Sequence, residues 1–409
     1  MNSIEIFEMA LGVETPWHIT DVDLKINEDK KQELHITMGF DRGTKFPDTT
    51  GALCPVHDTS NKTWRHMNFF QHDCYIHCKV PRIKTTEGKV QLIDVPWARQ
   101  GSGFTLLFEA MAMHLIEREM PVNKVGEMLG EEPHRIWTIF NYWIKRSYQA
   151  DTVENVDALG VDETSSRKGH KYVTTVVDLK KRRVLFATEG KGKETIQYAK
   201  QYLESKGVKA KQIKHVSSNL SPSFIAGFKA YFPTAEIHFD RFHVVKLLNE
   251  AMDHVRKEER KGNKELKGHR YTFLKNEVNL TADKKVALLD LTQQFPRLGE
   301  AYRFKEMFNE LWDQPSVREA ELFLESWCHA VAQTDLGPFK KFAKTLKKHK
   351  RGIVNFVETP INNGVMEGLN SKIQLAKRRA RGFRNIDNFI NMIYFLCSHL
   401  KFDYPCLSS

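Results

Sequence analysis

The amino-acid sequence predicts an α/β fold, and two patterns in the middle of the chain support this prediction. Between residues 156 and 190, three β-rich segments follow one another and are joined by short turns. From there to residue 243, helical and strand-like segments alternate, and Gly207 ends the first of these helices. Three strands joined as hairpins, followed by alternating helices and strands, are typical of a ribonuclease-H-like sheet.

The N-terminal part of the chain, residues 1–103, predicts a small domain of mixed structure. The runs "VDLKI" and "ELHITMGF" alternate apolar and polar residues, which predicts a β-hairpin between Val22 and Phe40. Residues 89–98 form a third candidate strand.

Residues 104–150 predict three helices in the order of a helix-turn-helix. Pro121 stands at the first turn of a short second helix, and Gly130 breaks that helix before a longer third one. The third helix ends in Lys145 and Arg146, as suits a helix that approaches DNA. The pattern leaves two interpretations open, a DNA-binding domain and a plain helical linker.

The chain after residue 243 is almost wholly helical. We predict that a helical insertion interrupts the core sheet and that the core resumes with a helix capped by Asn362 or Asn363. The predicted segments are 1–103 (N-terminal mixed domain), 104–150 (helix-turn-helix), 151–243 (first part of the core), 244–355 (helical insertion) and 356–409 (last part of the core).

Composition narrows the class of partner. The net charge of +11 and the pI of about 9.2 favour a polyanion such as nucleic acid, although a merely basic protein would have the same balance. Six cysteines in 409 residues are too few for a disulfide framework. The sequence shows no signal peptide, membrane span or GxxxxGK[ST] loop. We therefore expect a cytoplasmic, nucleoid-associated protein that needs no ATP.

Two carboxylates are candidates for metal-dependent chemistry. Asp162 ends the first core strand, and strand ends are where α/β sheets present functional groups. Glu367 lies in the first turn of a late helix, whose dipole stabilises a negative charge. Such acids suit Mg²⁺ or Mn²⁺, because these cations prefer oxygen ligands and bind substrate phosphates jointly. Two such ions can activate the attacking oxygen and stabilise the leaving one.

A third acid is expected at the end of the fourth strand, next to the first strand in the sheet. Asn219 occupies this position, and its amide can ligate a metal but brings no negative charge. Asp240, near the end of the next strand, is the nearest substitute in sequence.

Basic residues predict where DNA is held. Residues 372–384 carry six basic residues and no acid, and residues 340–351 carry seven. Along a helix, Arg378 lies about 16 Å from Glu367, a distance suited to gripping phosphates beside a cut. The candidate DNA-binding residues are Lys372, Lys377, Arg378, Arg379, Arg381, Arg384, Arg135, Lys145, Arg146 and Arg65.

Several blocks resemble the ISL-type insertion-sequence transposases. They are "GVDETSSRKGHKYVTTVVD", "VSSNLSPSFIAGFKAYFP.AEIHFDRFHVVKLLNEAMDHVR" and "NNGVMEGLNSKIQLAKRRARGFRNIDNF". The resemblance extends over nearly the whole chain and implies a DDE transposase, which cuts element ends and joins them to target DNA with Mg²⁺ or Mn²⁺. By position, Asp162 matches the first catalytic acid, Glu367 the third, and Asn219 the second Asp of the family. We therefore expect catalysis to be impaired.

The resemblance also implies a zinc ribbon in the N-terminal domain, which this chain has only in degenerate form. Cys54-x-x-His57 and Cys74-x-x-His77 have spacings that suit tetrahedral Zn²⁺. A second pair of ligands is missing after "VPRIK". Zinc ligation and ordinary buried thiols therefore both remain open.

The sequence leaves three functions to compare. The first is a DNA transposase that binds terminal inverted repeats and target DNA, cleaves and transfers strands, and acts as a homodimer by analogy. The second is a catalytically inactive relative that occupies or regulates element ends, as Asn219 suggests. The third, a nuclease or resolvase without strand transfer, agrees less well with the full-length resemblance.

Overall fold

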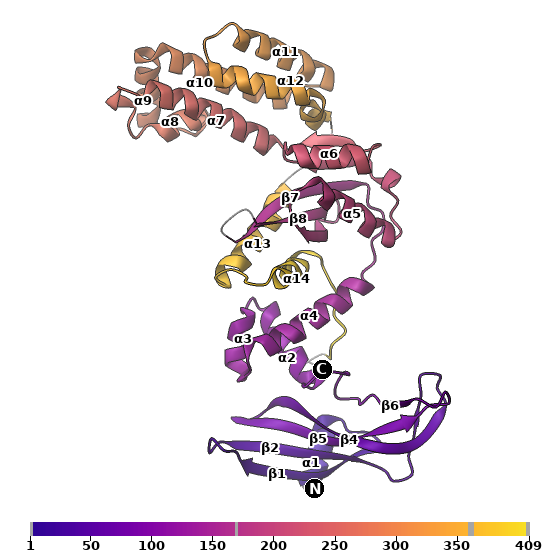
Figure 1. Ribbon diagram of the computed structural model, residues 1–409. Helices are drawn as coiled ribbons and strands as arrows, with labels where there is room; N and C mark the ends of the chain where they lie inside the picture. The colour runs from indigo at the N-terminus through magenta and orange to yellow at the C-terminus, as the bar shows by residue number, and fades with distance from the viewer. Residues whose placement is uncertain (1–2, 168–170, 359–363, 406–409) are drawn as a thin grey trace. The chain divides into compact units, whose positions relative to one another are not determined.

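A computed structural model describes residues 3–167, 171–358 and 364–405 of the chain (Figure 1). The chain divides into two compact units, Met1–Ser147 with Lys401–Ser409, and Tyr148–Leu400. Within the described ranges, no helix is both long enough and apolar enough to cross a membrane.

The first unit opens with a six-stranded sheet, in the order β1-β2-β5-β4-β3 with β6 beside β5. The predicted hairpin is confirmed as the antiparallel pair β1–β2, and the third predicted strand is reduced to the short β6. Ile36 of β2 faces Ile76 of β5 across a parallel pair, and both side chains are buried. The elements are α1 (Ser3–Leu11), β1 (Trp17–Ile26), β2 (Gln32–Phe40), β3 (Lys45–Pro47), β4 (Leu53–Phe69), β5 (His72–Lys84) and β6 (Val90–Leu92).

The three predicted helices are α2 (Leu106–Glu117), α3 (Val122–Leu129) and α4 (Pro133–Ala150). The Thr105 hydroxyl accepts a hydrogen bond from the backbone N–H of Phe108 and caps α2. Gly130 has a φ of 69° and ends α3 in the left-handed conformation, for which glycine carries no steric penalty.

The second unit contains a five-stranded sheet in the order β11-β10-β7-β8-β9. The strands β7, β8 and β9 are antiparallel neighbours, whereas β10 is parallel to both β7 and β11. This is the predicted sequence of hairpins followed by alternating helix and strand. The strands are β7 (Ala158–Arg167), β8 (Lys171–Asp178), β9 (Arg183–Glu189), β10 (His215–Ser218) and β11 (Glu236–Phe239).

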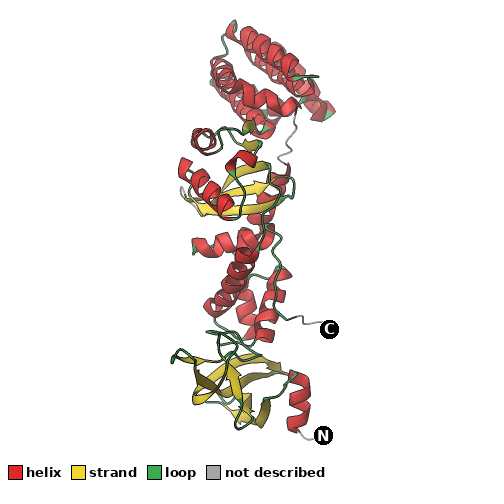
Figure 2. Ribbon diagram, turned by 90° about the vertical axis from the view of Figure 1, so that its right-hand side faces the viewer, coloured by secondary structure: helices red, strands yellow, loops and turns green. Residues whose placement is uncertain are grey.

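Helices cover both faces of this sheet (Figures 1 and 2). On one face, α5 (Lys193–Ser205) and α6 (Pro222–Tyr231) share an apolar core with β7, β8, β9 and β10. On the other face lies α13 (Gly364–Arg379), and α14 (Ile386–Cys397) packs beside β9. The predicted caps of α13, Asn362 and Asn363, lie outside the described residues.

Gly160 lets α13 approach β7 closely. A Cβ atom at this position would lie 2.7 Å from the Met366 sulfur and 2.7 Å from a methyl carbon of Leu179. Both distances are far below van der Waals contact, so a side chain at this position would displace the ends of the Met366 and Leu179 side chains.

A helical bundle lies between β11 and α13 in sequence, as predicted for the insertion. It is joined to the sheet through α12, where Gly352 packs against Phe239 so closely that a Cβ would lie 2.5 Å from the ring. The helix is kinked at His349, whose ring meets that of Phe239. The helices are α7 (Arg241–Glu259), α8 (Arg270–Leu274), α9 (Ala282–Gln294), α10 (Pro296–Phe308), α11 (Val317–Ala332) and α12 (Gly337–Glu358).

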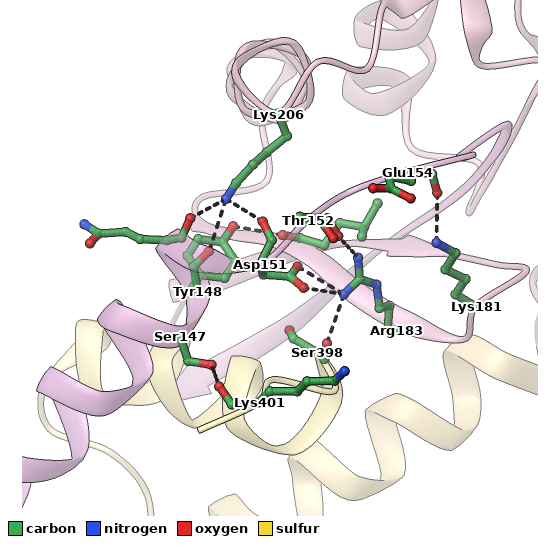
Figure 3. A network of polar contacts seen from close by, with 12 residues as sticks. Ser147, Tyr148, Asp151, Thr152, Glu154, Lys181, Arg183, Lys206, Ser398 and Lys401 are labelled. Carbon is green, nitrogen blue, oxygen red and sulfur yellow. Dashed lines mark hydrogen bonds and ion pairs between the residues drawn. The ribbon is translucent and has the colours of Figure 1, made fainter. Parts of the chain in front are cut away.

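The side chains of Lys206 and Arg183 hold the segment that leads from α4 to β7 (Figure 3). The Lys206 ammonium donates to the carbonyls of Gln149 and Asp151 at 2.9 and 2.8 Å, which satisfies the end of α4. The Arg183 guanidinium donates to both carboxylate oxygens of Asp151 and to the Thr152 carbonyl. These contacts fix where β7 begins.

Candidate active site

The candidate site begins with a row of three polar residues on adjacent strands. Asn219 and Asp240 follow the carboxyl ends of β10 and β11. Asp162 lies inside β7, which continues to Arg167 beside β8, so the prediction that Asp162 ends the first core strand is wrong. In the parallel register, Val161 of β7 faces Ser218 of β10, and Ser218 faces Phe239 of β11. The residues that follow these three are Asp162, Asn219 and Asp240, which therefore stand level across three neighbouring strands. The sequence prediction that Asn219 follows a strand paired with the Asp162 strand is confirmed.

Asp162 is held by two hydrogen bonds and forms no ion pair among the described residues. Its Oδ1 accepts from the backbone N–H of Glu163 at 2.9 Å, and its Oδ2 accepts from the Asn370 amide at 2.6 Å. Burial raises the pKa of this carboxyl, and the two hydrogen bonds oppose the shift. A partly buried carboxylate whose charge is not balanced by an ion pair suits a bound cation.

Helix α13 docks along β7 through polar residues on one helical face. Asn370 donates to Asp162, the Gln374 amide donates to the Thr164 hydroxyl at 2.6 Å, and the Lys377 ammonium donates to the Ser165 carbonyl at 2.5 Å. Glu367 precedes Asn370 by three residues and shares this face, because residues three and four apart are neighbours on a helix. Its exposed side chain is therefore on the helix turn next to Asp162.

Asn219 is turned toward Glu163 by its own hydrogen bonds. Its amide nitrogen donates to Glu163 Oε2 at 2.9 Å, and its amide oxygen accepts from the backbone N–H of Ser221 at 2.9 Å. No hydrogen bond joins Asn219 to Asp162 within the described part of the chain. An aspartate could not donate the first of these bonds, so the orientation depends on the amide.

Asp240 caps α7 and carries a histidine partner. Its Oδ1 accepts from the backbone N–H of Phe242 at 2.9 Å, and its Oδ2 lies 2.8 Å from His243 Nδ1. This hydrogen bond raises the pKa of His243. Both residues act electrostatically on Asp162.

Sequence reasoning missed Glu163, Asn370 and His243 in this cluster. The spacing of Asn370, Gln374 and Lys377 is a recognisable polar stripe on a helix, but nothing local shows that it faces a strand. Asp162, Asn219 and Asp240 carry oxygen donors of the kind that a hard divalent cation such as Mg²⁺ or Mn²⁺ prefers, but the Asn219 side chain is directed to Glu163.

The candidate DNA-binding residues have different environments. Lys372, Arg378, Arg381, Arg384 and Lys145 are exposed. Other members of the predicted set interact with the protein itself. Lys377 donates a hydrogen bond to Ser165, and Arg379 also has a partner. Arg135 forms an ion pair with Glu131, and Arg146 forms one with Asp403 at 2.6 Å.

Arg65 requires a correction. Its side chain is only 2% exposed and forms ion pairs with Asp73 at 2.6 Å and Glu131 at 3.6 Å. The guanidinium holds the β4–β5 hairpin to the helices of the same unit, so it does not present its charge to a phosphate. Local sequence could not show this, because Glu131 is 66 positions away.

The four candidate zinc ligands are not brought together. Cys74 faces the core of the sheet, whereas His77, three residues later on the same strand, faces the opposite side and contacts His35. Cys54 pairs with Phe46 on β3, and the partner of Cys74 is His66, twelve residues further along β4. Burial raises the pKa of the Cys74 thiol to about 11 and favours the protonated form.

A helix-turn-helix followed by a mixed sheet that carries Asp162 and Asp240 is the arrangement expected of a DNA transposase. A family model described as "Transposase", for the ISL3 group, matches residues 159–393, and a model of the "Helix-turn-helix domain of transposase family ISL3" matches residues 93–144. The chain belongs to the ISL3 family of insertion-sequence transposases.

Two curated relatives agree with this assignment. The chain is 27% identical to the transposase for insertion sequence element IS1001 of Bordetella parapertussis over 373 residues, which cover 88% of this chain and 91% of the relative. It is 25% identical to the transposase for IS1557 of Mycobacterium tuberculosis over 419 residues, covering 94% and 93%.

Proposed function

We propose that this transposase binds the terminal inverted repeats of its element and has a ribonuclease-H-like core built for metal-dependent strand cleavage and transfer. The row of Asp162, Asn219 and Asp240, with the Glu367 helix docked beside it, is the observation that supports this proposal. Two copies would bring two element ends together. The mass of the complex with end DNA, measured in solution, would contradict the dimer if it contained one chain per pair of ends.

In this proposal each residue of the row has a defined part. Asp162 and Glu367 would supply negative oxygens to bound metal ions, and Asp240 would add a carboxylate where Asn219 offers only an amide. Asn370 holds the Asp162 carboxylate in place as a positioning residue. Bound Mg²⁺ or Mn²⁺ ions would polarise the scissile phosphate and support the attacking and leaving oxygens.

Asn219 gives the second candidate, an ISL3 relative that binds element ends but cuts them poorly. A strand-cleavage and strand-transfer assay with Mn²⁺ on end DNA distinguishes the two. Turnover by the chain as it stands, abolished by Asp162→Asn with DNA binding intact, supports the enzyme. Binding without turnover supports the inactive relative, and cleavage without joining would indicate a nuclease.

The exposed basic residues at the end of α13 and in the segment directly after it are expected to hold DNA through phosphates. Replacing Arg378, Arg381 and Arg384 together by alanine should weaken DNA binding for all sequences. The slope of log K against log salt should also fall, by about 1 for each phosphate that the variant no longer neutralises. Fluorescence anisotropy at several salt concentrations measures both quantities.

The matched control for this surface is Lys200→Ala. Lys200 lies on α5 and pairs with Glu204 at 3.6 Å, so its removal should leave the salt slope unchanged. An unchanged slope in the triple variant would show that the end of α13 does not contact phosphates.

A further inference from the structure

Three side chains of types that can bind a metal meet near the amino ends of β10 and β11, in the five-stranded sheet that also carries Asp162. His215 begins β10, and Glu236 and His238 lie two residues apart on β11. In the parallel register His215 faces Glu236 directly. Side chains two apart on a strand share a face, so all three project from the same side of the β10–β11 pair.

The distances between the ligand atoms fit one tetrahedral ion. His215 Nδ1 lies 3.1 Å from His238 Nε2 and 3.7 Å from Glu236 Oε2, and one ligand atom from each residue falls within 4.8 Å of the other two. Ligands about 2.0–2.1 Å from a tetrahedral zinc ion stand roughly 3.3 Å apart. A small movement of the half-exposed Glu236 side chain would complete three ligands.

His238 is buried beside His215, and its Nε2 lies at hydrogen-bond distance from His215 Nδ1. Its ring is 1% exposed, and its Nδ1 has no hydrogen-bond partner among the residues that the structure describes. Histidine imidazoles are the commonest metal ligands in proteins.

A second histidine pair in the chain shows what a cluster without this geometry looks like. His35 Nδ1 and His77 Nε2 are 2.8 Å apart, but Glu33 approaches the other ring nitrogen of His35, at 3.5 Å. The remaining nitrogen of His77 contacts the Thr63 hydroxyl at 3.0 Å. The lone pairs therefore do not converge on one point, and this cluster provides a natural control.

We propose that His215, Glu236 and His238 bind a divalent transition metal, with Zn²⁺ as the ion of choice and water in the fourth position. Two imidazoles and one carboxylate prefer Zn²⁺ to Mg²⁺, which keeps this site distinct from the oxygen-rich row at the other end of the strands. The guanidinium of Arg351 lies 4.0 Å from Glu236 Oε1, and it is 84% exposed and free to move away when the ion binds.

The ion would join β10 to β11 at their amino ends. Asn219 and Asp240 follow the carboxyl ends of these same two strands, so the metal would fix the relative position of two members of the candidate catalytic row. The proposal stands on the geometry of the three ligands and does not depend on whether the row is catalytic.

The test uses the full chain, stripped with a chelator and dialysed, then titrated with Zn²⁺ in competition with a chromophoric chelator. We expect one tightly bound ion per chain and a rise in melting temperature on binding. His215→Ala and Glu236→Gln, both at solvent-accessible positions, should each weaken binding by about 10-fold or more. Circular dichroism checks that both variants fold.

Two control variants locate the ion. The His35→Ala/His77→Ala double variant and Asp162→Asn should bind Zn²⁺ like the parent chain. Absence of binding by the parent chain overturns the proposal, as does unchanged affinity in both His215→Ala and Glu236→Gln, or loss of the ion in either control.

Discussion

Asn219→Asp is expected to raise metal-dependent cleavage of element-end DNA by about 100-fold or more, the usual size of a single strong electrostatic contribution at a reacting centre. In the present chain the Asn219 amide donates to Glu163 at 2.9 Å. A carboxylate there cannot donate, and it would repel Glu163. The new carboxylate should therefore turn toward the cation beside Asp162 and supply the missing negative ligand.

Asn219→Ala is the matched control, because it removes the hydrogen bond to Glu163 without adding charge. It should show no gain in cleavage. The gain in Asn219→Asp should disappear when Asp162→Asn is added. If Asn219→Asp binds end DNA normally but cuts no faster with Mg²⁺ or Mn²⁺, the row is not the metal site.

Glu109→Ala is expected to destabilise the first unit by about 3–5 kcal/mol, because it leaves buried partners without their charge. Glu109 is completely buried. Its carboxylate accepts from Arg99 at 3.0 Å, the Ser102 hydroxyl at 2.6 Å and the Trp143 indole at 2.8 Å. The residue thus ties α2 to α4 and to the preceding loop, and urea unfolding followed by tryptophan fluorescence measures the change in the free energy of unfolding.

Glu127→Ala provides the comparison for this stability effect. Glu127 pairs with Lys124 on the surface of α3, where both side chains are more than 60% exposed. Removing such a pair should change stability by no more than about 0.5 kcal/mol. Similar destabilisation in the two variants would show that the buried network of Glu109 contributes nothing special.

The helix boundaries and the order of the core strands could be predicted because their signals are local. Pro121 and Gly130 mark the ends of a short helix through backbone conformation alone, and the structure places α3 between them. The long hairpin β4–β5 was not predicted as strands. Its segment is rich in polar residues and cysteines, and only the completed sheet buries Cys74 and Cys78.

The spacing of Cys74 and His77 illustrates the same limit at a candidate site. Three residues apart suits metal ligation in a loop, but on a strand it directs the two side chains to opposite faces. Whether a spacing brings ligands together thus depends on an element that extends beyond the motif. His215, Glu236 and His238 show the reverse case, since adjacent strands bring together His215 and Glu236, which are 21 positions apart in sequence.

The sequence by itself determined the class of this protein, because models of the ISL3 transposase family match residues 93–144 and 159–393. It also determined that Asn219 stands where an acid is expected. Only the tertiary structure decided that Asn370 bonds Asp162 across 208 residues of sequence, that Asp240 stands level with Asn219, and that Arg65 is buried. Hydrogen-bond partners and the burial of side chains are decided when elements far apart in sequence pack together, and no local sequence pattern carries that information.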